Sequence, residues 1–275
     1  MAAQTSRAFR FSIGIHSAKS SAALRDKARR LEDAGFDALY LPDHIGAPAP
    51  FPVLTAIAAA TSAVRVGTYV LNACFYKPAL LARDAAAVND LSDGRLELGL
   101  GAGYVREEFE AAELPYPSAG QRVDYLEHVT TYLKKHLPSV PILIAGNGNR
   151  LLRIAAQHAD IIGLTGANDR GAGDALAERI ELVRAAAGDR FADLQLNLAI
   201  TGVSDSSGKP DLSMTRRYAP DLSDEQLLAL PAVLSGSPRD IADTLRGYRE
   251  TYGLTSVTVQ EHHAETFAKV IAEFR

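Results

Sequence analysis

The sequence predicts an α/β protein with a (βα)8 barrel, the TIM-barrel fold. Short, continuously apolar runs alternate with longer segments of helical periodicity, and this alternation repeats eight times. Strands of that kind are typical of a parallel sheet covered by helices, and the number eight favours a closed barrel over an open sheet. The length of 275 residues suits one such barrel. We therefore expect a single domain over residues 1–275.

The eight expected strands are short buried runs, rich in Val, Ile and Leu and bounded by turn residues. In chain order they are Phe9–Ile15, Ala38–Leu41, Val64–Leu71, Leu96–Leu100, Ile142–Ala145, Ile161–Leu164, Leu194–Ile200 and Ser256–Gln260.

Each expected strand is followed by a segment whose apolar residues recur at helical spacing. Gly35 stops the first helix, and Pro52 stands near the first turn of the second, as is typical of such positions. In chain order the helices are Ser20–Ala34, Pro52–Thr61, Pro78–Leu91, Val105–Glu113 with Gln121–Leu137, Arg150–His158, Asp174–Ala187, Pro238–Tyr252 and Ala264–Phe274.

One connection is much longer than the others. Residues 202–236, between the seventh strand and its helix, are polar and rich in Ser, Asp and Pro. A connection of this length indicates an insertion rather than a simple turn. We expect it to lie over the mouth of the barrel, where it would be a candidate lid.

The composition excludes several classes of protein. The hydrophobic share of 47% provides a sizeable core, and 29 Lys and Arg against 33 Asp and Glu leave no basic surface for nucleic acid. A single cysteine, Cys74, excludes an internal disulfide and a thiolate metal cluster. No apolar run approaches the roughly 18 residues of a membrane span, and no signal peptide is evident. We expect a cytoplasmic protein with no membrane or nucleic-acid partner; whether it forms a homodimer stays open.

Active sites of such barrels lie at the carboxyl ends of the strands, so the residues directly after each strand are the first candidates. They are His16, Asp43, His44, Tyr69–Asn72, Gly101–Tyr104, Gly146–Arg150, Thr165, Thr201, Glu261, His262 and His263.

Two of these segments are rich in glycine. Gly146–Arg150 runs from a strand into a helix, so it is either an anion-binding loop formed by free helix N–H groups or simply a tight turn. Gly99–Gly103 would let a flat cofactor approach the backbone. It is not G-x-G-x-x-G, because Tyr104 stands at the last position, so a Rossmann interpretation fails.

The histidines allow more than one interpretation. His44, beside Asp43, suits proton exchange near neutral pH, although a loop histidine that bonds a helix cap is an alternative. Glu261, His262 and His263 could bind a metal, but no partners at ligand spacing stand elsewhere, so we expect a solvated loop and no metal site. Cys74 is expected to be a small packing residue.

Five segments together resemble the luciferase-like monooxygenase superfamily, and within it the oxidoreductases that depend on coenzyme F420, a deazaflavin. They are LEDAGFDALYLPDHI (31–45), VRVGTYVL (64–71), LSDGRLELGLGAGYVREEF (91–109), QRVDYLE (121–127) and PILIAGNGNRLLRIAAQHADIIGL (141–164). The resemblance covers the chain from Phe9 to about Leu164, and the remainder matches by architecture alone.

The resemblance assigns roles to residues that match the family's motifs. Asp43 and His44 match a pair that meets the deazaflavin ring and the reacting substrate. The Tyr69–Val70 peptide matches a cis peptide that backs the ring. The cofactor-binding set is Asp43, Tyr69, Val70, Gly101, Ala102, Gly103, Tyr104, Gly146, Asn147, Gly148, Asn149 and Thr165.

The family also carries features that this chain lacks. Some members place a glutamate after the glycine-rich turn, where this chain has Tyr104, and a longer excursion before the fifth strand is missing here. The resemblance implies an enzyme that moves a hydride between F420 and a small organic substrate. Two alternatives remain, an FMN-dependent monooxygenase that uses reduced flavin and O2, and a non-catalytic flavin-binding relative.

Overall fold

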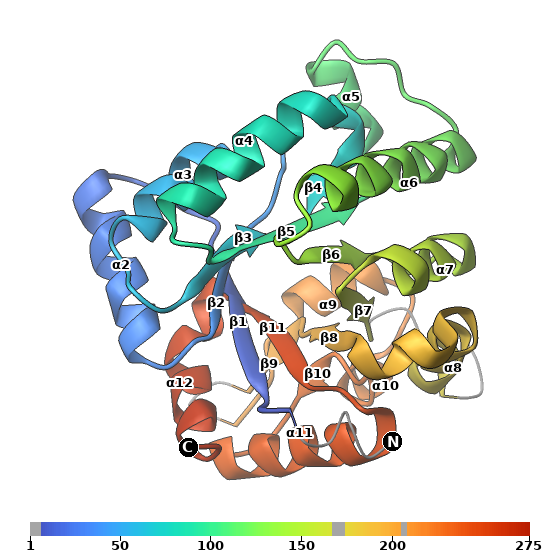
Figure 1. Cartoon of the computed structure of the whole chain (residues 1–275). Helices are drawn as coiled ribbons and strands as arrows, with labels where there is room; N and C mark the ends of the chain where they lie inside the picture. The colour runs from blue at the N-terminus through green and yellow to red at the C-terminus, as the bar shows by residue number, and fades with distance from the viewer. Residues whose placement is uncertain (1–6, 167–173, 205–207) are drawn as a thin grey trace.

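The structure, a computed structural model, describes residues 7–166, 174–204 and 208–275. Within these ranges it shows a closed parallel barrel of eight strands, as the sequence predicts (Figure 1). The barrel closes because β1 pairs with β11 and β3 pairs with β5. Its strands are β1 (Arg10–Gly14), β2 (Ala38–Leu41), β3 (Arg65–Thr68) continued by β4 (Leu71–Asn72), β5 (Leu96–Gly101), β6 (Ile142–Ala145), β7 (Ile161–Thr165), β8 (Gln195–Ala199) and β11 (Ser256–Gln260).

The third strand is interrupted, although its sequence predicts one run from Val64 to Leu71. The peptide between Tyr69 and Val70 is cis, as the resemblance implies, and it separates β3 from β4. The neighbouring strand β5 has glycines where this bend approaches it most closely. A Cβ on Gly99 would overlap the Thr68 carbonyl, and one on Gly101 would lie 2.7 Å from Cγ2 of Val70.

Helices surround the barrel and bury their apolar faces against the outward side chains of the strands. Several begin at a serine N-cap; Ser118 and Ser237 form full capping boxes, which satisfy two first-turn donors each. The helices are α2 (Ser21–Asp33), α3 (Pro50–Ala58), α4 (Pro78–Leu91), α5 (Arg106–Ala111), α6 (Ala119–His136), α7 (Asn149–His158), α8 (Ala175–Ala187), α11 (Pro238–Tyr252) and α12 (Ala264–Ala272).

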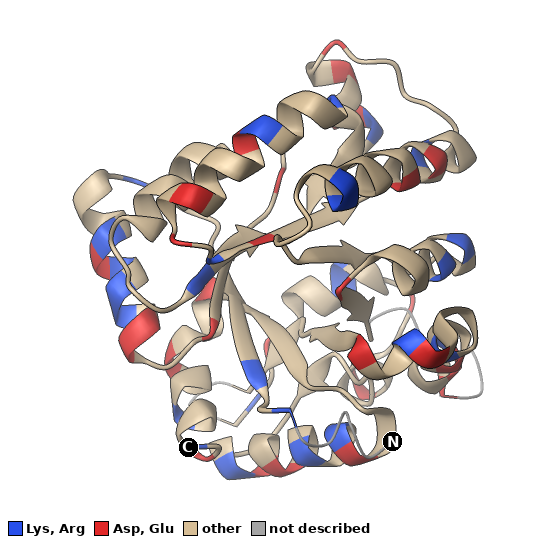
Figure 2. Cartoon of the chain, viewed as in Figure 1, with Lys and Arg blue, Asp and Glu red and all other residues tan. Residues whose placement is uncertain are grey.

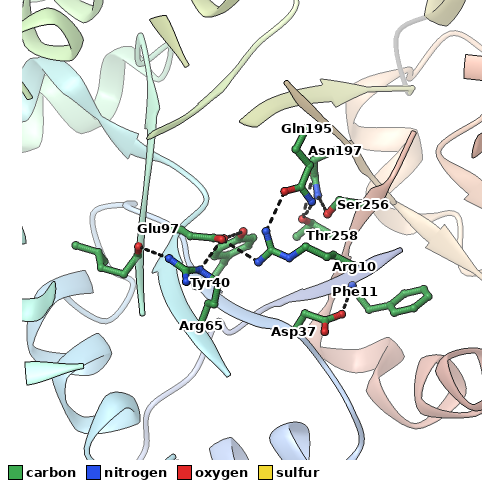
Figure 3. A network of polar contacts seen from close by, with 11 residues as sticks. Arg10, Phe11, Asp37, Tyr40, Arg65, Glu97, Gln195, Asn197, Ser256 and Thr258 are labelled. Atoms are coloured by element: carbon green, nitrogen blue, oxygen red, sulfur yellow. Dashed lines mark hydrogen bonds and ion pairs between the residues drawn. The ribbon is translucent and has the colours of Figure 1, made fainter. Parts of the chain in front are cut away.

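Acidic and basic side chains are interspersed along these outer helices, while the strands are mostly uncharged (Figure 2). The exceptions on the strands face the barrel interior. Glu97 of β5 is 2% exposed and forms ion pairs with Arg10 of β1, at 2.8 Å, and with Arg65 of β3, at 2.7 Å (Figure 3). Its second oxygen accepts a hydrogen bond from the Tyr40 hydroxyl. This network lies near the amino ends of the strands, away from the expected site.

A second polar group lies further along the interior. The Asn197 amide donates to Ser256 at 2.8 Å and to Thr258 at 3.0 Å (Figure 3). Its carbonyl oxygen accepts from the Tyr69 hydroxyl at 3.1 Å. The Tyr40 and Tyr69 rings stack with centroids 5.7 Å apart. Polar contacts therefore link the barrel interior to the Tyr69–Val70 peptide.

The segment 202–236 contains four short elements in its described part. Strands β9 (Gly202–Val203) and β10 (Val233–Leu234) pair in parallel, and helices α9 (Ser213–Tyr218) and α10 (Asp224–Leu228) lie between them. Apolar residues of the segment form a small core of their own, made of Ala219, Leu227, Leu230 and Val233. Thr215 of α9, fully buried, lies 2.8 Å from the hydroxyl oxygen of Thr201, which follows β8.

Candidate active site

All the residues assigned to the site by sequence lie at the carboxyl ends of barrel strands, on one face of the molecule. Asp43 and His44 follow β2, and Tyr69 and Val70 separate β3 from β4. The remaining residues end or follow β5, β6 and β7, and they are Gly101–Tyr104, Gly146–Asn149 and Thr165.

The carboxylate of Asp43 forms hydrogen bonds within the protein. One of its carboxylate oxygens accepts a hydrogen bond from the backbone N–H of Asn72, at 3.1 Å, and the Tyr76 hydroxyl also bonds the carboxylate. Burial raises the pKa of Asp43, and these bonds oppose that change. Asp43 therefore ties the loop after β2 to the short strand β4, next to the Tyr69–Val70 peptide.

His44, the next residue, contacts a different segment of the chain, and it forms a pair that the sequence interpretation missed. Its Nδ1 lies 2.7 Å from a carboxylate oxygen of Glu108, in the first turn of α5. The imidazole is half exposed at 49%, whereas Glu108 is 16% exposed. Because the carboxylate only accepts, Nδ1 carries the proton, and Nε2 is the nitrogen available to a ligand.

The glycine-rich turn after β5 packs closely against its own chain. Gly103 has a φ of +71°, and a Cβ there would overlap the side-chain amide of Asn72. The Gly103 carbonyl accepts from the Arg122 guanidinium at 2.8 Å. Since Val70 and Asn72 fill the room that Gly101 and Gly103 leave, contacts within the protein are enough to explain these glycines.

The turn after β6 is more open. Gly148 is the N-cap of α7 and provides no side-chain bond to the first helical N–H groups, and a Cβ on it would meet nothing within 4 Å. The Asn147 amide oxygen accepts from the Thr165 hydroxyl at 2.9 Å, which joins two of the predicted residues. Uncapped N–H groups beside open space fit an anionic group such as a phosphate.

Two other sequence candidates, His262 and His263, lie apart from this arrangement. His262 is exposed and lies 3.4 Å from Asp211, whereas His263 is buried at 6% exposure, so the expectation of a solvated loop was wrong for His263. His263 is the N-cap residue of α12, and its side chain is buried where that helix begins. Cys74 is partly buried beside the Ala102 carbonyl. Within the described residues, no three His, Cys, Asp or Glu side chains are arranged to hold a metal.

The fold and this arrangement define an α/β barrel with a candidate ligand site at the carboxyl ends of its strands. The sequence pattern of the luciferase-like monooxygenase family matches residues 4–209, more than half of the chain. The protein belongs to this family. In the described part of the chain, no helix combines the length and apolar character needed to cross a membrane.

Curated relatives share modest identity with the chain. An F420-dependent glucose-6-phosphate dehydrogenase from Amycolatopsis mediterranei is 28% identical over 239 residues, which are 74% of this chain and 72% of the relative. A 5,10-methylenetetrahydromethanopterin reductase from Archaeoglobus fulgidus is 29% identical over 47% of this chain and 45% of its own length. The chain thus spans about half the length of some of the relatives that it matches.

Solved structures confirm the fold. The coenzyme F420 dependent tetrahydromethanopterin reductase of Methanopyrus kandleri superposes with a TM-score of 0.76 at 16% identity, covering 98% of this chain and 100% of the other. The monooxygenase RslO1 of Streptomyces bottropensis gives a TM-score of 0.75 at 18% identity, over 96% and 98%. A reductase and a monooxygenase thus share this barrel, so the fold alone does not distinguish between these activities.

Proposed function

We propose that the protein is an oxidoreductase that moves a hydride between coenzyme F420 and a small organic substrate. The His44–Glu108 pair at the barrel mouth carries this proposal, because a half-exposed imidazole whose tautomer is fixed by a carboxylate is suited to proton exchange. The names of the F420-dependent relatives support the choice of cofactor.

The residues present fit such a cofactor. The open turn Gly146–Asn149 would hold its phosphate, with Thr165 supporting Asn147. Tyr69 and Val70 would back the ring from the barrel side, and Asp43, Ala102 and Tyr104 would border it. A deazaflavin bound there would supply a ring carbon that gives or accepts a hydride.

In this proposal His44 is the residue that donates the proton to the substrate or accepts it from the substrate. In the reducing direction a bound deazaflavin would supply a hydride to the carbon of a substrate C=O, and the oxygen then needs a proton to give the alcohol. Nε2 of His44 provides that proton, and Nδ1 stays bonded to Glu108, which holds the ring in place.

The segment 202–236 serves as a cover in this proposal. Tyr218, at the end of α9, is 42% exposed and lies against Tyr104 of the loop after β5. Tyr218 also lies near Tyr69. The two loops therefore approach each other above the proposed ring site, where they would limit access of water.

The test is titration of the protein with F420 and with FMN, followed by fluorescence of each cofactor. We expect F420 to bind more tightly, and reduced F420 on the protein to be oxidised by a carbonyl compound without O2. Tighter binding of FMN with O2-dependent oxidation would support the monooxygenase instead. Binding without turnover under either condition would indicate a non-catalytic flavin-binding relative.

Substitution of His44 tests its role. His44→Ala should lower turnover by roughly 10²–10⁴-fold, the usual contribution of a positioned acid or base, and leave F420 affinity within a few-fold. Glu108→Gln should lower turnover less, because the Gln side-chain oxygen still accepts from Nδ1 and keeps the imidazole oriented. His136→Ala, at the exposed end of α6, is the matched control. Unchanged hydride transfer in His44→Ala would remove His44 from the mechanism.

A further inference from the structure

A second polar pair, His16 and Gln260, lies at the mouth where the first and last strands of the barrel meet. Gly14 and Gln260 are register partners of β1 and β11. Side chains alternate along a strand, so Gly14 shares the face of Arg10, and Gln260 shares the face of Thr258. Arg10 and Thr258 both make their contacts inside the barrel (Figure 3). Gly14 and Gln260 thus belong to the inner wall at its open end.

The His16 imidazole folds over Gly14 to reach Gln260. Its Nε2 lies 2.7 Å from the side-chain oxygen of Gln260, and a Cβ on Gly14 would come within 3.2 Å of the same nitrogen. The backbone N–H of His16 donates to Glu261 at 2.8 Å, and Glu261 is in turn paired with Lys27. Both ends of His16 are therefore fixed, while its side chain stays exposed to the mouth.

The pair presents one donor and one acceptor, whichever way the amide is oriented. If the Gln260 oxygen accepts from Nε2–H, the free groups are the Nδ1 lone pair and the amide NH2. If the amide is reversed, the free groups are Nδ1–H and the amide oxygen. A hydroxyl group, which donates once and accepts at its lone pairs, satisfies both free groups.

We propose that His16 and Gln260 bind a neutral hydroxyl group of the substrate, apart from the atom that reacts at His44. This inference rests on the proposed function and specifies its substrate class, a small hydroxylated carbonyl compound or the matching diol. Lys27, a neighbouring cation, is already engaged with Glu261, whose carboxylate also accepts from the backbone of His16, so this cation is not offered to an anionic substrate group.

The cofactor ring is a second source of the same chemistry, because its carbonyl and N–H groups also offer acceptors and a donor. The affinity for F420 distinguishes the two sources. If the pair binds the substrate, F420 affinity is unchanged when the pair is removed. If it binds the ring, F420 affinity falls.

The experiment compares acetone, hydroxyacetone and pyruvate as oxidants of reduced F420 on the whole protein without O2. They differ only in the group beside the ketone, which is a methyl, a hydroxymethyl or a carboxylate. We expect hydroxyacetone to exceed acetone in kcat/KM by about tenfold or more, the effect of two neutral hydrogen bonds, mainly through a lower KM. We expect pyruvate to be no better than acetone.

Two variants locate the effect. His16→Ala and Gln260→Leu should each reduce the preference for hydroxyacetone and leave both the acetone rate and F420 affinity unchanged, whereas His136→Ala should keep the preference. Unchanged F420 affinity also shows that the variants are folded. For the unaltered protein, the proposal is overturned by equal rates with acetone and hydroxyacetone, by a preference for pyruvate, or by F420 binding with no ketone reduced. For the variants, it is overturned by a preference for hydroxyacetone that survives in both, or by weakened F420 binding. Failure of F420 to bind the unaltered protein would instead refute the proposed function.

Discussion

Replacing Glu97 by glutamine should destabilise the barrel strongly, although Glu97 lies far from the proposed chemistry. The carboxylate is 2% exposed and holds Arg10 and Arg65 at 2.8 and 2.7 Å. A hydrogen bond to a charged group contributes about 1.5–3 kcal/mol, and breaking a buried ion pair costs about 3–5 kcal/mol. The arginine side chains are 23% and 29% exposed, and Arg10 keeps a bond to Gln195 at 2.9 Å. Partial solvation places the expected loss near the lower limit, about 3 kcal/mol.

Urea unfolding, followed by tyrosine fluorescence and by circular dichroism, measures this loss if the two signals coincide. Glu110→Gln is the matched control, because Glu110 lies 4.0 Å from Arg106 and both side chains are more than 60% exposed. Such a surface pair contributes at most about 1 kcal/mol. A loss below about 1 kcal/mol for Glu97→Gln, equal to that of the control, would refute the view that this network stabilises the barrel.

Two further predictions concern other parts of the molecule. A phosphate or sulfate ion should bind at Gly146–Arg150 in crystals grown with either salt, and backbone amides turned away from solvent there would contradict this. Gly146→Ala should weaken F420 binding in a fluorescence titration, because its Cβ would lie 2.9 Å from Leu151. Burial, and then the neighbouring His262, lowers the pKa of His263 from 6.5 to about 4. Between pH 6.5 and pH 4 the unfolded chain therefore binds more protons than the folded protein, so the free energy of unfolding falls as the pH drops through this range. His263→Gln should flatten that dependence in urea unfolding at several pH values, and an unchanged slope would show that His263 does not titrate in this way.

Most of the barrel could be predicted from sequence, because buried strands and amphipathic helices leave local patterns. The elements of residues 202–236 could not, since β9 and β10 have two residues each and exist only through their mutual pairing. The helix expected from Pro52 begins at Pro50, because a proline fits the first turn equally well at either position.

The residues that make up the candidate site could be predicted in part for the same reason, and their roles stay predictions. Asp43 and His44 stand directly after a strand, which marks them along the chain. Glu108 resembles any acidic residue of an exposed helix, and only the packing of α5 brings it to His44. Its position in the first turn of the helix after the glycine-rich loop was the available signal. Gln260 was likewise not singled out, because the sequence shows it only as the last residue of a strand.

The pairing of β1 with β11 has a consequence for folding during synthesis. Arg10 of β1 is aligned with Ser256 of β11, so one edge of β1 stays unpaired until residues 256–260 have left the ribosome. An exposed parallel edge is open to pairing with other chains, and contacts between such distant residues form slowly. The nascent protein therefore passes through an open, incomplete sheet, in which this edge of β1 stays exposed until β11 pairs with it.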